Sequence, residues 1–504
     1  MISKEIKGGA LLSYATIFAT NIVGIVLTPY IIKSLGASEY GLYTMIGAFV
    51  GYLTVLDLGI NNSIIRFVAK YRAEKDKKGE ENFLAVSFII YAIISLTIIL
   101  LGSIGYLYLD ELFGKTLTLE QLNKAKIMVV ILIFNVAVTI PGGAFNAICM
   151  AYENFRLPKA INLIKYILRS ILVVVILFYG GDSISLVIVD TIMNLIFIIA
   201  MAYIALYKLN VKIRYYSFEK TLAMSIFHYS IWVFVLALVN KLRWQFGQLV
   251  LGLNYETTMV AIYAVGITLG SYYGAFSSAI SSLFLPKAMQ MTVKSESPQI
   301  MTDTFIKISR ISTYILFFIL GGFILVGRQF IHLWVGDTFN EAYLFTVLIM
   351  IGLTFTLSQS FGNDLLQAKN KHRFRGIVIL TATILGVAVG WYLSLRYGAI
   401  GLISSIVAFI FLERIVMWWY MTTEIHINMI NYFKDFSGQL VCFLIALLIS
   451  YPLLGLISTT GWFGLLTKII LFSAMYSGCM YQVMNTTEKR LVYDLIPATL
   501  KIKR

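Results

Sequence analysis

Apolar residues occur in long blocks along the chain, separated by short polar stretches. Fourteen of these blocks are about 20 residues or longer, enough for a helix to cross a hydrocarbon layer of ~30 Å. The predicted spans are 10–32, 41–60, 82–108, 125–149, 160–180, 184–207, 224–252, 258–285, 306–327, 342–366, 376–395, 399–421, 437–457 and 462–484. None shows the alternation of polar and apolar residues that is typical of a transmembrane β-strand. The pattern therefore predicts an all-α integral membrane protein of about 14 transmembrane helices.

Composition and loop length support this class. Hydrophobic residues make up 59% of the chain and charged residues 13%, against roughly 25% charged residues in an average soluble domain. The longest predicted connections, 109–124, 208–223 and 286–305, are too short to hold a folded domain. We therefore expect the chemistry of this protein to take place in or beside the bilayer.

The distribution of basic residues predicts the orientation of the spans. The net charge is +15, and most of the 40 Lys and Arg residues fall in the loops on one side of the predicted bundle, most densely at 66–78. This bias is the positive-inside rule and places both termini in the cytoplasm. It also explains the charge without a nucleic-acid partner. The first apolar block is too long for a cleaved signal peptide and is expected to remain as a helix.

The two halves of the chain share weak sequence matches at a nearly constant offset. Leu35-Gly36 matches Leu251-Gly252, Tyr43 matches Tyr263, Asn146, Ala151 and Arg156 match Asn363, Ala368 and Arg373, and Tyr179-Gly180 matches Tyr397-Gly398. Six predicted helices separate the copies, so both halves cross the membrane in the same sense. We expect two pseudo-symmetric six-helix lobes at 1–215 and 216–432, with two further helices and a cytoplasmic tail at 433–504.

A polar stripe runs along the seventh predicted helix. Lys241, Gln245 and Gln248 follow helical spacing, and Arg243 lies beside them. Because the helix is longer than the bilayer requires, we expect it to tilt, bend or unwind. Two interpretations remain open: these residues bind a substrate in a water-filled cavity, or the two cations reach the outer interface and snorkel.

The fifth and sixth predicted helices carry a second set of charges. Lys165 and Arg169 lie one turn apart on one face, as a phosphate clamp requires, although two anchors at the inner edge fit the same spacing. Asp190, one turn from Asn194, is expected to neutralise a cation on a neighbouring helix or to carry a coupling ion or proton.

Five other charged positions have structural interpretations. Glu413 and Arg414 are adjacent in the twelfth helix, where they form a structural pair or line the same cavity. Arg310, Lys126 and Lys468 lie near span ends and are expected to snorkel.

Signatures of enzymes and cofactors are missing from the sequence. It has no P-loop, and its four histidines and three cysteines lack metal-ligand spacing. No catalytic triad is apparent. We therefore expect no catalytic residue, no metal and no cofactor.

Several short segments together resemble one family of transporters. They are LGASEYGLY at 35–43 with Asp57-Leu58-Gly59 and Arg66, WQFGQLVLG at 244–252, AIYAV at 261–265 with Leu285-Pro286-Lys287, LWVG at 333–336, and QAKNKHR at 367–373 with Tyr397-Gly398. In their order and spacing the chain resembles the polysaccharide transporters of the Wzx flippase type, in the MOP superfamily that includes the MATE exporters. The resemblance covers about residues 5–435.

This resemblance implies a V-shaped transporter with a cationic central cavity. Such proteins move a polyprenyl-pyrophosphate-linked oligosaccharide from the inner to the outer leaflet of the bacterial plasma (inner) membrane by alternating access, for O-antigen, lipopolysaccharide or capsule synthesis. A polysaccharide polymerase or ligase is a further partner that the resemblance allows. The implied site comprises Lys165, Arg169, Lys241, Arg243, Gln245 and Gln248. One departure is Gly247, where the family often has an acidic residue, which leaves Asp190 as the better candidate for ion coupling.

Three other functions remain open from the sequence. A cation-coupled multidrug exporter of the same superfamily would need a cavity rich in carboxylates, whereas the predicted cavity is basic. A scaffold subunit of a polysaccharide assembly complex would tolerate substitution of the polar stripe. A peptidoglycan-precursor flippase would share the pyrophosphate site.

Overall fold

The computed structural model describes residues 4–217, 220–281, 284–369, 371–457, 459–486 and 488–490. All regular secondary structure in these ranges is helical. Residues 491–504, predicted as part of a cytoplasmic tail, lie outside the described residues. The all-α fold predicted from the sequence is confirmed.

The chain divides into two compact units, the first made of residues 1–265 and 379–406. Its elements are α1 (Lys4–Leu35), α2 (Ala37–Gly51), the 3-10 helix η1 (Tyr52–Asp57), α3 (Ile60–Ala73), α4 (Lys77–Leu107), α5 (Leu109–Phe113), α6 (Leu119–Ala151), α7 (Arg156–Phe178), α8 (Ser183–Tyr203), the π-helical turn η2 (Ile204–Lys208), α9 (Lys220–Trp244), α10 (Phe246–Asn254) and the start of α11 (Thr257–Ser281). The middle of α16 (His372–Glu424) completes this unit.

The second unit comprises residues 266–378 and 407–504. Its elements are the remainder of α11, α12 (Leu285–Val293), α13 (Pro298–Val335), the 3-10 helix η3 (Asp337–Phe339), α14 (Ala342–Ser358), α15 (Ser360–Ala368), both ends of α16, α17 (Met429–Gly455) and α18 (Gly461–Val483).

The predicted spans fall on these helices. The described residues hold 10 helices long and apolar enough to cross a membrane, or 11 if the bent pair α14 and α15 counts as one span. One of the ten, Arg373–Glu424, has 52 residues and covers two predicted spans. These apolar helices establish a multi-pass membrane protein, while the count of 14 spans remains a prediction.

Two of the long helical segments are broken. The seventh predicted span divides into α9 and α10 at Gln245, so the helix bends or unwinds as expected from its length. Helix α16 contains Gly398 at φ 60° and ψ −147°, which is not helical and divides the two predicted spans within it. Only glycine adopts this backbone without strain.

The local structure at the repeated positions is similar in the two halves. Gly180, the partner of Gly398 in the repeat, also has a positive φ, at 84°. Helices α6 and α15 end at the matched Ala151 and Ala368. The compact units nevertheless differ from the repeat boundaries, because 216–265 and 379–406 pack with the first unit. The division into repeats therefore remains a sequence-based prediction.

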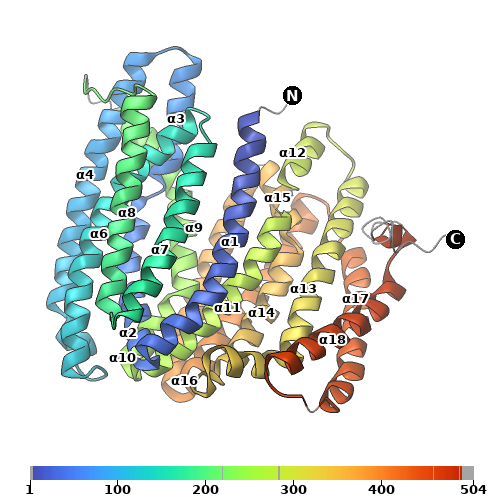
Figure 1. Cartoon of the computed structure of the whole chain (residues 1–504). Helices are drawn as coiled ribbons and strands as arrows, with labels where there is room; N and C mark the ends of the chain where they lie inside the picture. The colour runs from blue at the N-terminus through green and yellow to red at the C-terminus, as the bar shows by residue number, and fades with distance from the viewer. Residues whose placement is uncertain are drawn as a thin grey trace. The chain divides into compact units, whose positions relative to one another are not determined.

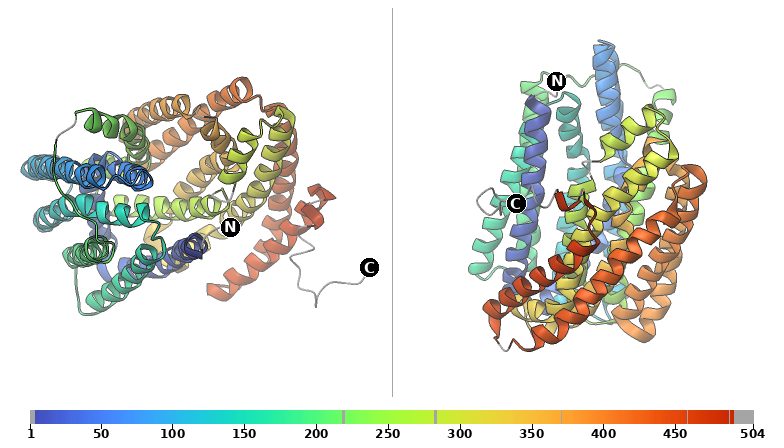
Figure 2. Two further views of the ribbon diagram at one scale, coloured as in Figure 1. Left: turned by 90° about the horizontal axis from the view of Figure 1, so that it is seen from above. Right: turned by 90° about the vertical axis from the view of Figure 1, so that its right-hand side faces the viewer.

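Neighbouring helices in each unit pack along their apolar faces. In the first unit α6 lies between α4 and α8 (Figure 1). In the second, α17 and α18 run side by side, as both views in Figure 2 show, and pack on α13. Stacked Phe317 and Phe443, with ring centroids 4.5 Å apart, join α13 to α17. This packing leaves polar residues inside the bundles in need of partners.

Candidate functional site

The cation of α7 and the carboxylate of α8 meet inside the first unit. Arg169 forms an ion pair with Asp190, and its Nη2 also donates to Asp190 Oδ2 at 3.1 Å. The Tyr43 hydroxyl of α2 donates to the same oxygen at 3.1 Å. Asp190 is therefore held by three helices and neutralises Arg169, which is the geometry of a counter-ion.

Lys165 lies one turn before Arg169 and has a different environment. Its ammonium donates to the Asn194 side-chain oxygen at 3.4 Å and lies 4.6 Å from the centre of the Phe197 ring. Asn194 in turn donates to Asn135 of α6 at 3.1 Å. No ion pair within 4.0 Å is found for Lys165 among the described residues, so its partners are a neutral amide and a ring.

The polar stripe of the seventh predicted span lies at the break between α9 and α10. The Lys241 ammonium donates to the Gln245 side-chain oxygen at 2.9 Å. A Cβ atom at Gly51 would lie 3.5 Å from both of these atoms, so the missing side chain leaves room beside the ammonium. The Tyr52 hydroxyl donates to the Lys241 carbonyl at 3.0 Å and fastens the break to η1. Within the described part of the chain Lys241 has no carboxylate within ion-pair distance.

The two remaining members of the predicted stripe differ from Lys241. Arg243 is buried, with 9% of its surface exposed, and its Nη2 donates to the Thr383 hydroxyl of α16 at 2.8 Å. This burial contradicts the interpretation of Arg243 as a snorkelling residue. Gln248 is half-buried on α10 and lies past the break. The structure thus joins Lys241 to Gln245 directly, whereas Arg243 ties α9 to α16.

Gly247 has a steric role at this break. A Cβ atom at this position would lie 2.2 Å from the hydroxyl oxygen of Tyr263, which is fully buried. An acidic side chain in the present arrangement would collide with Tyr263 and Leu402. The packing of this unit therefore explains why residue 247 is a glycine and not the acidic residue that is frequent in the family.

The two arginines singled out in the second unit are paired with carboxylates. Arg414 forms an ion pair with Glu413, each with 1% of its side chain exposed. Arg310 is also buried and donates to Glu488 at 2.7 Å and to Asp435 at 2.6 Å. The prediction that Arg310 snorkels was wrong, because its carboxylate partners lie far along the chain and could not be found by periodicity.

Glu488 lies outside the membrane-spanning helices, and its surroundings affect its titration. Burial alone would raise the pKa of this carboxyl group, but hydrogen bonds from Arg310 and the backbone of Asn485, together with the Arg310 charge, lower the pKa below its ordinary value. Glu488 therefore favours its ionised form, which neutralises Arg310.

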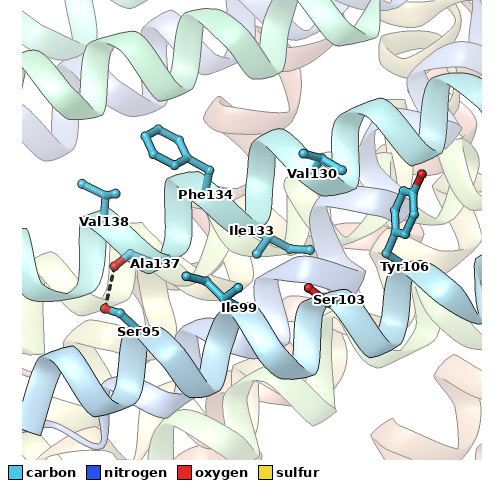
Figure 3. A pocket seen from close by; sticks show the side chains of 9 residues that line it. All are labelled: Ser95, Ile99, Ser103, Tyr106, Val130, Ile133, Phe134, Ala137 and Val138. Atoms are coloured by element: carbon cyan, nitrogen blue, oxygen red, sulfur yellow. Dashed lines mark hydrogen bonds between the residues drawn. The ribbon is translucent and has the colours of Figure 1, made fainter.

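An apolar groove lies between α4 and α6 on the first unit (Figure 3). Its volume is about 530 Å³, and it is lined by Ser95, Ile99, Ser103, Tyr106, Val130, Ile133, Phe134, Ala137 and Val138. The Ser95 hydroxyl donates to the Ala137 carbonyl and so has its partner within the protein. Since no lining residue is charged, this groove fits hydrocarbon chains and not a phosphate.

The described residues contain no group of three or more His, Cys, Asp or Glu that could hold a metal ion. The remaining candidate chemistry is electrostatic. In the first unit Lys165 and Lys241 donate to amide oxygens, and Arg169 is paired with the carboxylate of Asp190. Sequence reasoning missed the residues that position these cations, Tyr43, Tyr52 and Asn135, because their contacts join different helices.

Comparison with protein families identifies a match over much of the chain. A family model described as "Polysaccharide biosynthesis protein" matches residues 6–286, more than half of the sequence. A putative O-antigen transporter of Shigella flexneri is 20% identical over 402 residues, which cover 78% of this chain and 92% of that protein.

Solved structures show the same fold at low sequence identity. The lipid II flippase MurJ in an inward closed conformation has a TM-score of 0.70 and 18% identity, with 96% of this chain and 99% of that chain covered. An inward-facing multidrug resistance MATE transporter of the MOP superfamily has a TM-score of 0.67 and 14% identity, with 83% and 98% covered. The chain therefore has the transporter fold of these proteins.

Proposed function

Since the chain belongs to the polysaccharide biosynthesis protein family, we propose that it is a flippase for a polyprenyl-pyrophosphate-linked oligosaccharide. It moves this lipid from the inner to the outer leaflet by alternating access of two six-helix lobes, at 1–215 and 216–432. The family and its structural neighbours consist of transporters, and the protein is not an enzyme.

The observation that carries this proposal is the environment of Lys165 and Lys241. Each ammonium lies within an apolar span and donates to a neutral amide oxygen. An intramembrane cation requires an anion or water to offset its desolvation. The pyrophosphate of the lipid-linked substrate supplies that anion, and its oxygens accept hydrogen bonds from both ammonium groups.

The other predicted site residues have supporting roles. Arg169 is released to the pyrophosphate when a phosphate oxygen replaces Asp190, since both are anionic acceptors for a guanidinium. The amides of Gln245 and Gln248 donate and accept, as sugar hydroxyl groups require. Arg243 holds α9 against α16 through Thr383 and maintains the position of Lys241.

The membrane potential is able to drive outward transport of an anionic lipid without ATP hydrolysis. Two negative charges moving outward across an inside-negative potential of ~100 mV gain roughly 4.6 kcal/mol, at ~2.3 kcal/mol per charge. This direction follows if the protein lies in the bacterial plasma membrane with both termini in the cytoplasm, as the basic loops predict. Consumption of the product by a polymerase or ligase on the outer side would keep the gradient favourable.

Two other functions are less well supported. A multidrug exporter fits less well because the matching family is described as a polysaccharide biosynthesis protein and the similar Shigella flexneri protein as a putative O-antigen transporter. In a scaffold subunit that transports nothing, two lysines in apolar spans, without carboxylate partners among the described residues, would have no function to offset the free energy of their desolvation.

The proposal is tested by reconstitution into liposomes with a fluorescent polyprenyl-pyrophosphate oligosaccharide. The parent protein should move the lipid between leaflets, and Lys241→Ala should slow this transfer at least about tenfold, corresponding to ~1.4 kcal/mol. Lys241→Arg should retain part of the rate because the charge is kept.

Lys468→Ala is the matched control, because Lys468 also donates to a glutamine oxygen, that of Gln329 at 3.0 Å, but near the end of a span in the second unit. Its rate should equal that of the parent. A folded parent that transfers no lipid under either polarity of the membrane potential would refute the proposal.

A further inference from the structure

The second predicted span contains a carboxylate at a break in its helix. Asp57 ends η1, and the next two residues, Leu58 and Gly59, have φ values of 51° and 73° before α3 begins. Its partner Tyr91 lies nine residues into the predicted span 82–108, or ~14 Å at 1.5 Å per residue. Asp57 therefore contacts α4 within the part of that helix that is predicted to cross the membrane.

Asp57 is surrounded by neutral donors. Its Oδ1 accepts from the Tyr91 hydroxyl of α4 at 3.2 Å and from the Asn61 Nδ2 at 3.0 Å, and the carboxylate also accepts from the backbone N–H of Gly59. No Lys or Arg forms an ion pair with it within the described residues. This environment differs from that of Asp190, which Arg169 neutralises.

The helices packed on this segment bring no other charge to Asp57. Helix α4 contributes Tyr91, which is the titratable group in contact. Helix α6 approaches through Gly143, where a Cβ atom would lie 2.9 Å from Asn61 Nδ2. Helix α9 carries Lys241, whose ammonium bonds to Gln245. A charge on Asp57 is thus offset by hydrogen bonds alone.

Asn61 supplies an acceptor that the ionised carboxylate does not use. Its Oδ1 atom is buried and has no hydrogen-bond partner, although its Nδ2 donates to Asp57. A protonated carboxyl group has an O–H that needs an acceptor. Rotation of the Asn61 amide would present Oδ1 to that proton, so one side chain can satisfy Asp57 in both of its protonation states.

We propose that Asp57, with Asn61 and Tyr91, is a proton-binding site that couples a proton gradient to lipid transfer. This inference rests on the proposed flippase function and names its coupling ion. The carboxylate takes a proton from water on one side of the membrane and releases it to water on the other, with no other bond formed or broken. Neutralisation occurs at the break between η1 and α3, so it removes a charge at a point where the backbone of this span leaves the helical conformation.

The contacts favour a proton over a sodium ion. Sodium is a hard cation that binds oxygen ligands, as calcium and magnesium do. Two of the three groups directed at Asp57 are N–H donors, from Asn61 and Gly59, which repel a cation. A proton needs only the carboxylate and one acceptor.

Transport in liposomes tests the coupling. At zero membrane potential, an imposed pH gradient should accelerate transfer by the parent severalfold, whereas Asp57→Asn should transfer lipid at a rate that does not depend on the gradient. The exposed Asp303, bonded to Gln299, supplies the control, and Asp303→Asn should respond as the parent does. Retained dependence in Asp57→Asn, or dependence on sodium in place of protons, overturns the proposal.

Infrared difference spectroscopy provides a test that needs no transport. A pH titration of the parent in lipid should show the band of a protonated carboxyl group that is absent from Asp57→Asn. Tyr91→Phe should retain this band and move its midpoint to higher pH, because the ionised form loses a donor. If the parent has no such band, Asp57 is not a proton-binding site, even if the protein transfers lipid. If the band is present but the protein transfers no lipid, the proposed flippase function is wrong and the proton-binding site is still supported.

Discussion

Two buried arginines of the second unit and two half-buried lysines of the first unit have partners of opposite kinds. In the second unit Arg310 and Arg414 are buried against carboxylates, Glu488 with Asp435 and Glu413. In the first unit Lys165 and Lys241 are half-buried and donate to amide oxygens. A cation paired with a carboxylate has its counter-charge in the fold, whereas Lys165 and Lys241 have no carboxylate within ion-pair distance among the described residues. Lys468, which also donates to an amide, differs from these two in lying near the end of a span, so the position in the span matters as well as the type of partner.

The largest effect on stability is expected from Arg310→Ala. Removing one partner of a buried ion pair leaves the other charge uncompensated, which costs roughly 3–5 kcal/mol. The unfolding free energy in detergent should fall by this amount. Lys307→Ala is the control, since Lys307 is exposed one turn earlier on the same helix. An equal stability of the two variants would contradict a structural role for Arg310.

A smaller effect is expected for the pair of Arg169 and Asp190, whose side chains are 23% and 25% exposed. Asp190→Leu and Arg169→Met alone should each lower the unfolding free energy by about 1–3 kcal/mol, and the double variant should recover most of the loss, because no charge is then left unpaired. Thermal unfolding of all four proteins completes the double-mutant cycle. Additive losses would mean that the two residues act independently.

Little change in stability is expected from Lys241→Met. Replacing an unneutralised ammonium by an apolar side chain removes its desolvation cost, so the unfolding free energy should rise or fall by less than about 1 kcal/mol. Lys468→Met serves for comparison in denaturant unfolding. If Lys241→Met lowered the unfolding free energy as much as Arg310→Ala does, Lys241 would have an anionic partner in the fold. The contrast between Lys241 and Arg310 would then be wrong.

The smallest expected effect is a decrease in the unfolding free energy at acid pH that is due to Glu488. Its pKa is lowered from the ordinary value of 4.5, so the stabilisation it contributes is complete above that value and is lost as the pH falls through the lowered pKa. Each unit of lowering corresponds to ~1.4 kcal/mol. The unfolding free energy of the parent should decrease below pH ~4.5 with a component that is absent from Glu488→Gln. Parallel pH profiles would contradict the shift.

Much of the helical fold was accessible from the sequence because apolar blocks predict membrane helices directly. In the described residues the predicted spans fall on one helix or on consecutive helical elements, and the excess length of 224–252 predicted the bend or break found at Gln245. The matched glycines Gly180 and Gly398 both adopt positive φ values, so the repeat also indicated equivalent turns.

The partners of the charged residues were less predictable. Asp190 lies 21 residues from Arg169, but the bonds of Arg310 to Asp435 and Glu488 span 125 and 178 residues. Periodicity shows which face of a helix carries a residue and not which helix lies opposite. The contact of Asp57 with Tyr91 was missed for the same reason, since it joins η1 to α4.

The ion pair of Arg310 and Glu488 forms late in the synthesis of the protein. The ribosome completes the 178 residues between them in roughly 10–35 s at 5–20 residues per second. During that interval α13 is present in the membrane with an arginine whose main carboxylate partner has not been made. An unfinished chain therefore differs from a finished one in the electrostatic environment of this one arginine, which is completed only when synthesis has passed α18.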